Sequence, residues 1–457
     1  MPNNDERSAL LRQAAERAIG YLDQVGQRSV APSPAAVAAL TELDEAMPTG
    51  PTDAGQALAL LDRVVGPATM AMAGPRFFGF VIGGALPATL AANWLAGAWD
   101  QNAGLYDVTP GVAHLEKVAL GWLTRLFGLP PSCSGAFVTG ATIANFTSLA
   151  AARHEVLHRA GWNVEADGLF SAPPITVIVG AEAHPTVTKA LGLLGLGRKR
   201  VVAVPTDNQG RIRAEQMPRI EGPTIVCLQA GNVNTGAFDP VGEIGPEARA
   251  AGAWVHVDGA FGLWARASET LMPHAAGIEH ADSWATDAHK WLNVPYDCGV
   301  AFVRDSRALP AAMAITAEYL PTDSPGRNPS DFTPELSRRA RGVEVWTALR
   351  TLGEAGVAEM IERNCRQARR FAEGLRAAGF EILNDVVLNQ VLVSFGEPER
   401  TRRVIRALQE EGTCWCGITV WHGRTAMRIS VCSWATRDND VERSLAAIVS
   451  VAAASGT

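Results

Sequence analysis

Short apolar strands alternate with helical segments through the middle of this chain, and this alternation narrows the possible folds more than any other feature. The predicted strands lie at 135–139, Ile175–Val179, Val201–Val204, Thr224–Leu228, Trp254–Asp258 and Val300–Val303. Helices are predicted between them, for example at Ile143–Leu157. This pattern is typical of a mostly parallel sheet with helices on both faces. We therefore expect an α/β fold whose ligands bind where the strands end.

The length of 457 residues is too great for one hydrophobic core, so we expect more than one domain. Two amphipathic helices, at 8–26 and 54–65, cannot form a core alone, and we assign residues 1–74 to an N-terminal helical arm. Residues 75–342 form the expected large domain. Residues 343–457, in which short strands and helices alternate, form an expected smaller α+β domain.

Composition argues against several classes of protein. Hydrophobic residues make up 47% and charged residues 19% of the chain, as in soluble globular proteins, and a net charge of −7 offers no basic surface for nucleic acid or an anionic membrane. The longest apolar run, Phe77–Trp99, is broken by glycines and a proline, so no membrane span is expected. Seven scattered cysteines fit neither a zinc ribbon nor a disulfide framework, so we expect no metal and a cytoplasmic location.

A glycine-containing turn joins the first predicted strand to an apolar helix. It comprises Thr139, Gly140, Ala141 and Thr142. Free N–H groups at the start of a helix, with nearby hydroxyl groups, suit a phosphate. Any strand-to-helix turn can carry such residues, and Thr142 is equally well explained as a plain helix N-cap. The turn therefore indicates a phosphate site only in combination with other residues.

Polar residues follow several other predicted strands. His184, Asn232 and Asp258 each stand at or near a strand end, and Lys290 lies in the nearly uncharged stretch DSWATDAHKWLN. Three of the four have a simpler explanation: Lys290 as an exposed lysine, Asp258 as a helix N-cap and His184 as a turn histidine. His256, two residues before Asp258, is interpreted as a structural residue that faces away from it. We expect the strand-end residues to share one pocket.

The order of these groups suits pyridoxal 5′-phosphate (PLP). A lysine binds the aldehyde of PLP as a Schiff base, a carboxylate keeps the pyridine nitrogen protonated, and a helix N-terminus holds the phosphate. Lys290, Asp258 and the turn at Thr139–Thr142 would supply these three functions.

The sequence also resembles a known family, the group II PLP-dependent amino acid decarboxylases, which act on aromatic amino acids, glutamate or diaminobutyrate. The motifs that carry the resemblance are GAFVTGATIANFTSLAAAR, HVDGAFG, DSWATDAHKWLN and MRISVCSW, and it extends from about Pro75 to Val441. It implies a fold type I enzyme, a homodimer with shared active sites, and an N-terminal arm that embraces the partner.

The resemblance also assigns roles to single residues. Lys290 is implied to be the Schiff-base lysine, Asp258 the partner of the pyridine nitrogen, and His184 the residue that stacks on the cofactor ring. The other implied cofactor-binding positions are Thr139, Gly140, Ala141, Thr142, Asn232, Ala260, Thr286 and His289. The implied reaction converts an L-amino acid to its amine and CO2. The alternatives are an aldehyde synthase that deaminates oxidatively, an aminotransferase-like enzyme, and a non-catalytic PLP-binding protein.

Two positions depart from the pattern of the family. The segment Ser324–Pro334, where the family has a catalytic loop tyrosine, contains none, and Phe332 is its nearest equivalent. Phenylalanine there is associated with aldehyde products. Asp287 replaces an asparagine that contacts the phosphate; because a carboxylate would repel the phosphate unless it faces away or is protonated, Thr286 is expected to take that contact.

The substrate pocket is expected to include Phe77–Leu86 and Gln101–Pro110, with a loop from the partner subunit closing over it. The first segment is largely apolar, with Arg76 at its edge, which favours a bulky or aromatic substrate. Arg428 is either a ligand of the substrate carboxylate or a solvated arginine at a strand end.

Overall fold

The structure is a computed structural model that describes residues 4–315 and 325–456. The chain forms two compact units, each assembled from segments that are distant in sequence. The larger unit comprises Gly83–Arg369 and Leu383–Leu392, and the smaller unit comprises Met1–Ile82, Arg370–Ile382 and Val393–Thr457. Within the described residues, no helix is both long enough and apolar enough to cross a membrane.

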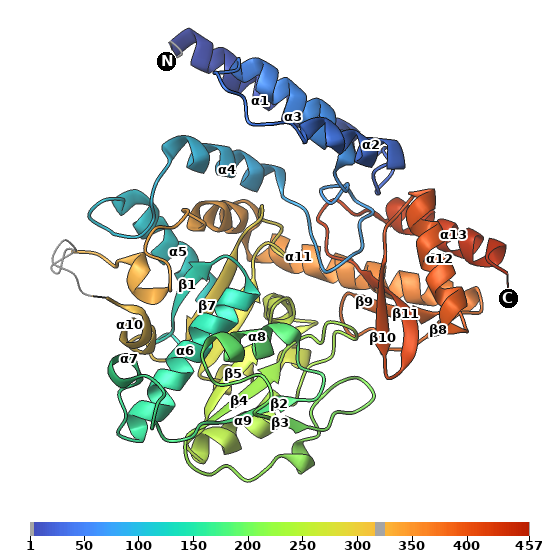
Figure 1. Ribbon diagram of the computed structural model, residues 1–457. Helices are drawn as coiled ribbons and strands as arrows, with labels where there is room; N and C mark the ends of the chain where they lie inside the picture. The colour runs from blue at the N-terminus through green and yellow to red at the C-terminus, as the bar shows by residue number, and fades with distance from the viewer. Residues whose placement is uncertain (1–3, 316–324, 457) are drawn as a thin grey trace. The chain divides into compact units, whose positions relative to one another are not determined.

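A seven-stranded sheet forms the centre of the larger unit (Figure 1). Its strands, in chain order, are β1 (Ser134–Val138), β2 (Thr176–Gly180), β3 (Val201–Val204), β4 (Thr224–Gln229), β5 (Trp254–Asp258), β6 (Ser283–Asp287) and β7 (Gly299–Val303). They are arranged in the order β1-β7-β6-β5-β4-β2-β3. Strands β2 to β6 pair in parallel, and β7 runs antiparallel to both β1 and β6. The expected mostly parallel sheet is confirmed.

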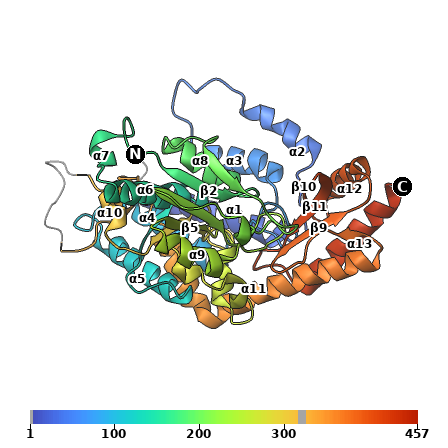
Figure 2. The same cartoon turned by 90° about the horizontal axis from the view of Figure 1, so that it is seen from below.

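Helices cover both faces of this sheet. Figure 2 shows α6 (Ala141–Arg159) and α8 (Pro185–Leu193) on one face and α9 (Val241–Ala250) on the other. A buried cluster that includes Leu149 of α6, Val179 of β2 and Ile225 of β4 fills the space between α6, α8 and the sheet. Removing each such side chain from water contributes about 1.5–3 kcal/mol.

The remaining helices of the larger unit surround this core. They are α4 (Pro87–Trp99), α5 (Pro110–Leu126), α7 (Val164–Asp167), α10 (Ala308–Met313) and short 3-10 helices η2 (Ala214–Gln216), η3 (Gly262–Ala267), η4 (Met272–Ala275), η5 (Ile278–His280) and η6 (Pro329–Phe332). α11 (Gly342–Ala377) contains a non-helical residue, Gly353, with φ 61°, where the sequence predicts a break between two helices.

The smaller unit contains the N-terminal helices and a four-stranded sheet. Its helices are α1 (Asn4–Val25), α2 (Pro34–Ala38), η1 (Ala39–Leu43), α3 (Ala54–Ala68), α12 (Pro398–Glu411) and α13 (Asp438–Ala454). The sheet has the order β10-β11-β9-β8, with β8 (Glu381–Ile382), β9 (Gln390–Ser394), β10 (Gly417–Trp421) and β11 (Arg424–Ser430). An ion pair of 2.9 Å between Arg17 and Asp62 joins α1 to α3.

The strand directions bring several chain segments to one edge of the large sheet. Because β2, β4, β5 and β6 are parallel, they end at the same edge, and β1 also ends there because β7 reverses direction between β6 and β1. The turn before α6, the residues after β5 and the residues after β6 therefore come together. This edge is where ligands bind in sheets of this kind.

Candidate active site

The end of β6 lies against the N-terminus of α6. The backbone N–H of Ala141, the first residue of α6, donates to Asp287 Oδ1 at 2.6 Å. The first N–H groups of a helix have no partner within the helix and carry partial positive charge, so they bind anions. A Cβ atom on Gly299 would lie 2.5 Å from Gly140 Cα, so a glycine at this position lets β7 approach the turn.

Lys290 follows three residues after Asp287, and its amine contacts the same carboxylate. Lys290 Nζ lies 2.9 Å from Asp287 Oδ2, and the lysine side chain is 19% exposed. The expectation of a partly buried lysine at the end of the sheet therefore agrees with its placement. The amine, the carboxylate and the N-terminus of α6 form one contiguous polar group.

Asp287 faces the turn at Thr139–Thr142, which is the expected phosphate site. Its orientation therefore does not relieve the expected repulsion between its carboxylate and a phosphate. Its carboxylate points at the backbone N–H of Ala141, and it is 2% exposed. Thr286 precedes it on β6 and therefore points to the opposite side of the sheet. The Thr286 hydroxyl is fully buried and donates to Ala260 O at 3.4 Å, so the structure does not bring Thr286 to this turn.

His289 borders the same group. Its Nδ1 accepts a hydrogen bond from the Cys298 backbone N–H at 3.0 Å, which places the ring proton of the neutral form on Nε2, 3.6 Å from Asp287 Oδ1. Burial lowers the pKa of His289, while the Asp287 carboxylate opposes that shift. The ring stacks on Tyr296 with the two ring centroids 4.3 Å apart.

Asp258 ends β5 with its carboxylate almost completely buried. The side chain of Asn145, on α6, donates to Asp258 Oδ2 at 3.2 Å, and the Ala260 backbone N–H donates to Oδ1 at 3.2 Å. Asp258 and His184 line the same small cavity, together with Cys227, Gln229 and Asp239 among others. The sequence-based expectation that Asp258 and His184 share a pocket is consistent with this cavity.

His184 caps the N-terminus of α8. Its Nδ1 accepts from the Thr186 backbone N–H at 3.3 Å and lies 2.8 Å from Thr186 Oγ1. The Nδ1 atom of His184 therefore makes the contacts of a turn residue, as the simpler explanation expected. Because Nδ1 accepts, the neutral ring carries its proton on Nε2. The cap fixes the orientation of the ring beside Asp258.

The interpretation of His256 as a residue that faces away from Asp258 is wrong. Residues two apart on a strand lie on the same face, and His256 Nε2 lies 2.9 Å from the Oδ1 of Asn145, the residue that donates to Asp258. His256 is fully buried, and burial lowers its pKa to about 3. The sequence analysis also missed Asn145. A polar amide one helical turn after Ala141, between Ala144 and Phe146, was the available signal.

The depressed pKa of His256 predicts acid sensitivity of the fold. Between about pH 6.5 and 3, an unfolded chain binds a proton on this histidine and the folded chain does not, so stability falls as the pH falls through this window. From pH 7 to 5 this contribution is about 2 kcal/mol. Urea unfolding at both values should show a smaller loss for His256→Gln than for the parent, because glutamine retains polar contacts and cannot titrate. An equal loss in the two proteins would contradict this account.

The other expected cofactor positions divide into two groups. Thr139, Gly140 and Thr142 surround the N-terminus of α6, where Asp287 lies, and Ala260 lies next to Asp258 and accepts from the Asp287 backbone N–H. Asn232 holds its own loop together: its Oδ1 accepts from the backbone N–H groups of the two residues at 234 and 235. Its contacts are thus those of a turn residue.

Phe332, the expected equivalent of the loop tyrosine, lies in η6. The Arg327 guanidinium stacks over the Phe332 ring at 3.7 Å, and the ring packs against the core cluster that includes Leu149 and Leu309. In this chain, therefore, Phe332 contacts the hydrophobic core of its own subunit.

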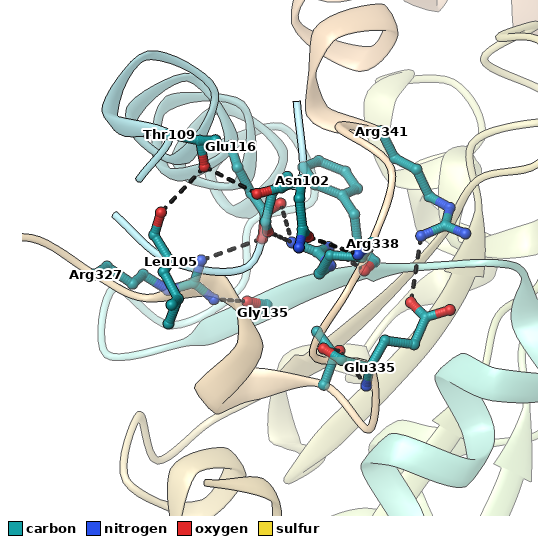
Figure 3. Close-up of polar contacts among 12 residues, drawn as sticks. Asn102, Leu105, Thr109, Glu116, Gly135, Arg327, Glu335, Arg338 and Arg341 are labelled. Atoms are coloured by element: carbon teal, nitrogen blue, oxygen red, sulfur yellow. Dashed lines mark hydrogen bonds and ion pairs between the residues drawn. The ribbon is translucent and has the colours of Figure 1, made fainter. Parts of the chain in front are cut away.

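Two arginines and a buried glutamate hold the segment around Phe332 in place (Figure 3). Glu116 of α5 accepts from Arg327 at 3.3 Å and from Arg338 at 2.7 Å. The same arginines donate to the backbone carbonyls of Gly135 and Phe137 on β1, which is an edge strand of the sheet. These hydrogen bonds provide partners for backbone carbonyls of β1 on the edge of the sheet that no strand covers. Ser324, the first residue of the expected loop Ser324–Pro334, lies outside the described residues.

Three further expectations concern the smaller unit. Arg76 is 3% exposed and donates to Thr413 O at 2.7 Å and Gly26 O at 2.9 Å, so it is a buried structural residue and not the rim of a pocket. Arg428, on β11, is half-buried, and that burial lowers its pKa. Phe80, in the segment expected to line the substrate pocket, is 59% exposed and stacks on Trp415.

The residues at the edge of the large sheet fit PLP. The N-terminus of α6 is already bound to a carboxylate, which shows that it accepts an anion. Lys290 offers a partly buried amine, and Asp258 offers a buried carboxylate for a protonated ring nitrogen. One feature does not fit an anionic ligand. The Asp287 carboxylate already accepts the Ala141 N–H hydrogen bond that a phosphate oxygen would accept.

Comparison with known proteins agrees with this assignment. A family model described as the pyridoxal-dependent decarboxylase conserved domain matches residues 37–396. Tryptophan decarboxylase 1 of Oryza sativa is 27% identical, covering 94% of this chain and 90% of the relative, and L-2,4-diaminobutyrate decarboxylase of Rhizobium meliloti is 31% identical, covering 80% and 75%. The crystal structure of Oryza sativa TDC with PLP and tryptamine has a TM-score of 0.91 and 24% identity, covering 99% and 98% of the two chains.

Proposed function

Because the chain belongs to the pyridoxal-dependent decarboxylase family, and is a PLP-dependent amino acid decarboxylase of fold type I, we propose that it converts an L-amino acid with a bulky or aromatic side chain to the corresponding amine and CO2. The observation that carries the proposal is the contact of Lys290 with the carboxylate at the N-terminus of α6, which puts the amine beside an anion site. Phosphate at one end and an amine a few ångströms away is the recognition that PLP requires.

The chain supplies a distinct group for each end of the cofactor. Lys290 Nζ would bind its aldehyde, and the turn at Gly140 and Ala141 its phosphate, where His289 Nε2–H is also directed. Asp258, buried and hydrogen-bonded by Asn145 and Ala260, would hold a proton on the pyridine nitrogen. Bound PLP supplies an electron sink for the electron pair released when the bond from Cα to the carboxylate breaks.

The remaining steps are positioning and proton transfer by this chain's own groups. His184, whose Nδ1 is held by the cap on α8, lines the cavity that it shares with Asp258. Lys290 Nζ lies 2.9 Å from the Asp287 carboxylate and would be available to carry a proton near the substrate. We propose that these two groups hold and deliver the proton that replaces CO2 at Cα.

The proposed substrate class rests on two observations. The segment 77–86 is rich in phenylalanine and glycine, with Phe80 exposed, and a relative that acts on tryptophan is similar over 94% of the chain. Apolar and aromatic surface binds apolar side chains through the hydrophobic effect. Purified enzyme should be offered tryptophan, tyrosine, phenylalanine, glutamate and 2,4-diaminobutyrate, with CO2, amine, aldehyde and O2 measured together. Preference for glutamate or diaminobutyrate would refute this substrate class.

The same assay tests the alternative that Phe332 suggests. An aldehyde synthase consumes O2 and releases aldehyde and ammonia in place of amine. The observation that favours amine formation is the placement of Phe332 under Arg327 and against the core of its own subunit. Equal yields of CO2 and amine without O2 uptake are expected. Aldehyde formation with O2 uptake would instead identify an oxidative enzyme.

We also propose a homodimer with shared active sites. α1 exposes the large apolar side chains of Leu11 (63%) and Ile19 (51%), and α4 exposes those of Leu95 (54%) and Trp99 (49%). Exposed apolar surface of this kind marks an interaction site. Light scattering should give twice the mass of the chain, and a mass of one chain at assay concentration would rule the dimer out.

Asp287 is expected to weaken cofactor binding. Its carboxylate lies where the phosphate would bind, and like charges at short range in a partly buried site repel by about 1 kcal/mol or more. Asp287→Asn should therefore bind PLP at least about fivefold more tightly to the apoprotein. Pyridoxal, which lacks the phosphate, serves as the matched control ligand and should show no such gain. Weaker PLP binding by the variant would show that the ion pair with Lys290 is the more important contact.

A further inference from the structure

We infer that Asn145, oriented by His256, is a positioning residue that sets both Asp258 and His184 for the cofactor. The inference deepens the proposed function and rests on it, because it assumes that Asp258 and His184 face PLP. Neither Asn145 nor His256 would itself touch the cofactor. Their effect is carried by a continuous series of hydrogen bonds in the larger unit, which runs from Trp254 at the beginning of β5 to the site at its end.

The series has only one consistent direction up to Asn145. The Trp254 indole N–H can only donate, and it donates to Ser283 Oγ at 2.8 Å. The Ser283 hydroxyl hydrogen then goes to His256 Nδ1, 2.9 Å away. With Nδ1 accepting, the neutral His256 ring carries its proton on Nε2, which donates to Asn145 Oδ1 at 2.9 Å. The direction is fixed from the other end: the Asp258 carboxylate takes the Asn145 amide nitrogen, so the Asn145 oxygen faces His256 Nε2 and must accept from it.

Asn145 passes this orientation to two residues at once. With its oxygen held by His256, its amide nitrogen donates one hydrogen to Asp258 Oδ2 at 3.2 Å and the other to Thr186 Oγ1 at 3.3 Å. The Thr186 hydroxyl, which accepts from Asn145, is left to donate to His184 Nδ1 at 2.8 Å. A single amide thus holds the carboxylate expected to face the pyridine nitrogen and the ring expected to stack on the cofactor.

Loss of the His256 donor would release the amide. An asparagine side chain is nearly symmetric, so without that donor it can rotate and present its oxygen to Asp258, where two acceptors would meet. Asn145, His256 and Ser283 are fully buried, so water cannot easily replace the lost donor. Burial lowers the pKa of His256 and so favours the neutral ring, and the contacts with Ser283 and Asn145 select the tautomer that is protonated on Nε2.

A purely structural role is the competing explanation, because the same bonds join α6 to β5 and β6. The two explanations differ in what they predict for the cofactor. A structural network would change the stability of the apoprotein and leave bound PLP unaffected. A positioning network would change the affinity for PLP and the absorption spectrum of the bound cofactor, because both depend on the charge beside the pyridine nitrogen.

The experiment compares His256→Phe with His256→Gln in the full-length enzyme. Phenylalanine fills the space without any donor, whereas glutamine has an amide N–H that can still donate to Asn145. Apoprotein is titrated with PLP, the pH dependence of the bound-cofactor absorbance is recorded, and thermal unfolding of the apoprotein is followed separately. We expect His256→Phe to raise the dissociation constant for PLP about tenfold and to shift the pH profile. His256→Gln is expected to restore both.

Two further variants keep the result interpretable. If His256→Phe does not fold, Ser283→Ala, which removes the donor to His256 Nδ1, should produce the same changes to a smaller extent. Asp258→Asn is measured alongside: if it leaves the spectrum unchanged, the proposed role of Asp258 fails. If Asp258→Asn changes the spectrum but the network variants match the parent in affinity and pH profile, only the positioning role fails.

Discussion

Replacing Lys290 with alanine is expected to abolish covalent attachment of PLP and to lower the rate of decarboxylation at least about a thousandfold. Lys290 Nζ is the amine that lies in contact with the carboxylate at the N-terminus of α6, and alanine provides no nucleophile there. The loss should be seen both in CO2 release and in the absorbance of the enzyme-bound cofactor.

This chain offers a clean control for that experiment, because it contains few lysines. The others are Lys117, Lys189 and Lys199, and all three are exposed. Lys189→Ala, on α8 near His184 in sequence, should leave activity and absorbance unchanged. If Lys290→Ala still attached PLP covalently, another lysine would have to be the cofactor ligand, and the assignment of the site would be wrong.

Replacing Asp258 with asparagine is expected to lower the decarboxylation rate about a hundredfold. A neutral amide is nearly the same size but cannot form an ion pair with a protonated pyridine nitrogen, and loss of one partner of a buried charge pair costs about 3 kcal/mol. The enzyme should still bind PLP through Lys290 and the phosphate turn, but more weakly. Turnover and PLP affinity are therefore measured together.

Asp305→Asn is the control for loss of a carboxylate. Asp305 lies in the turn after β7, where its carboxylate pairs with Arg307 at the surface. Its replacement should leave turnover unchanged. If Asp258→Asn had full activity with unaltered absorbance, Asp258 would be only a residue of the turn before Ala260, which is the simpler explanation of its contacts.

Much of the fold could be predicted because most strands are continuous apolar runs. Val201–Val204 and Trp254–Asp258 have the bounds expected from the sequence, and Thr224–Leu228 is one residue short of β4. β4 is buried on both faces and shows no polar alternation over Thr224–Leu228, so the apolar run itself marks its length. The glycine turn and the strand-end Asp258 followed from these bounds.

β6 was missed for the opposite physical reason. Ser283–Asp287 mixes polar and apolar residues, yet all five are buried, because β6 lies between β5 and β7. Its polar groups are satisfied by partners distant in sequence: Ser283 by Trp254 and His256, Asp287 by Ala141. No local pattern records such contacts, so the orientation of Asp287 could not be foreseen.

The segment around Phe332 is a second case. Prolines and charged residues make it resemble an open loop, but the buried Glu116 pairs with both Arg327 and Arg338, and backbone carbonyls of β1 accept further hydrogen bonds from these arginines (Figure 3). Glu116 lies more than two hundred residues earlier in the chain. A sequence pattern shows that charges are present, and only the fold shows which of them are paired.

Reduction of the PLP-loaded enzyme with borohydride, followed by peptide mapping, tests the central claim most directly. Borohydride converts a cofactor–lysine linkage to a stable amine, and the four lysines Lys117, Lys189, Lys199 and Lys290 lie in different stretches of the sequence. The site described here predicts the reduced cofactor on the peptide that contains DSWATDAHKWLN, at Lys290 and nowhere else. A stoichiometric label on any other lysine, or none on Lys290 in enzyme that decarboxylates, would contradict it.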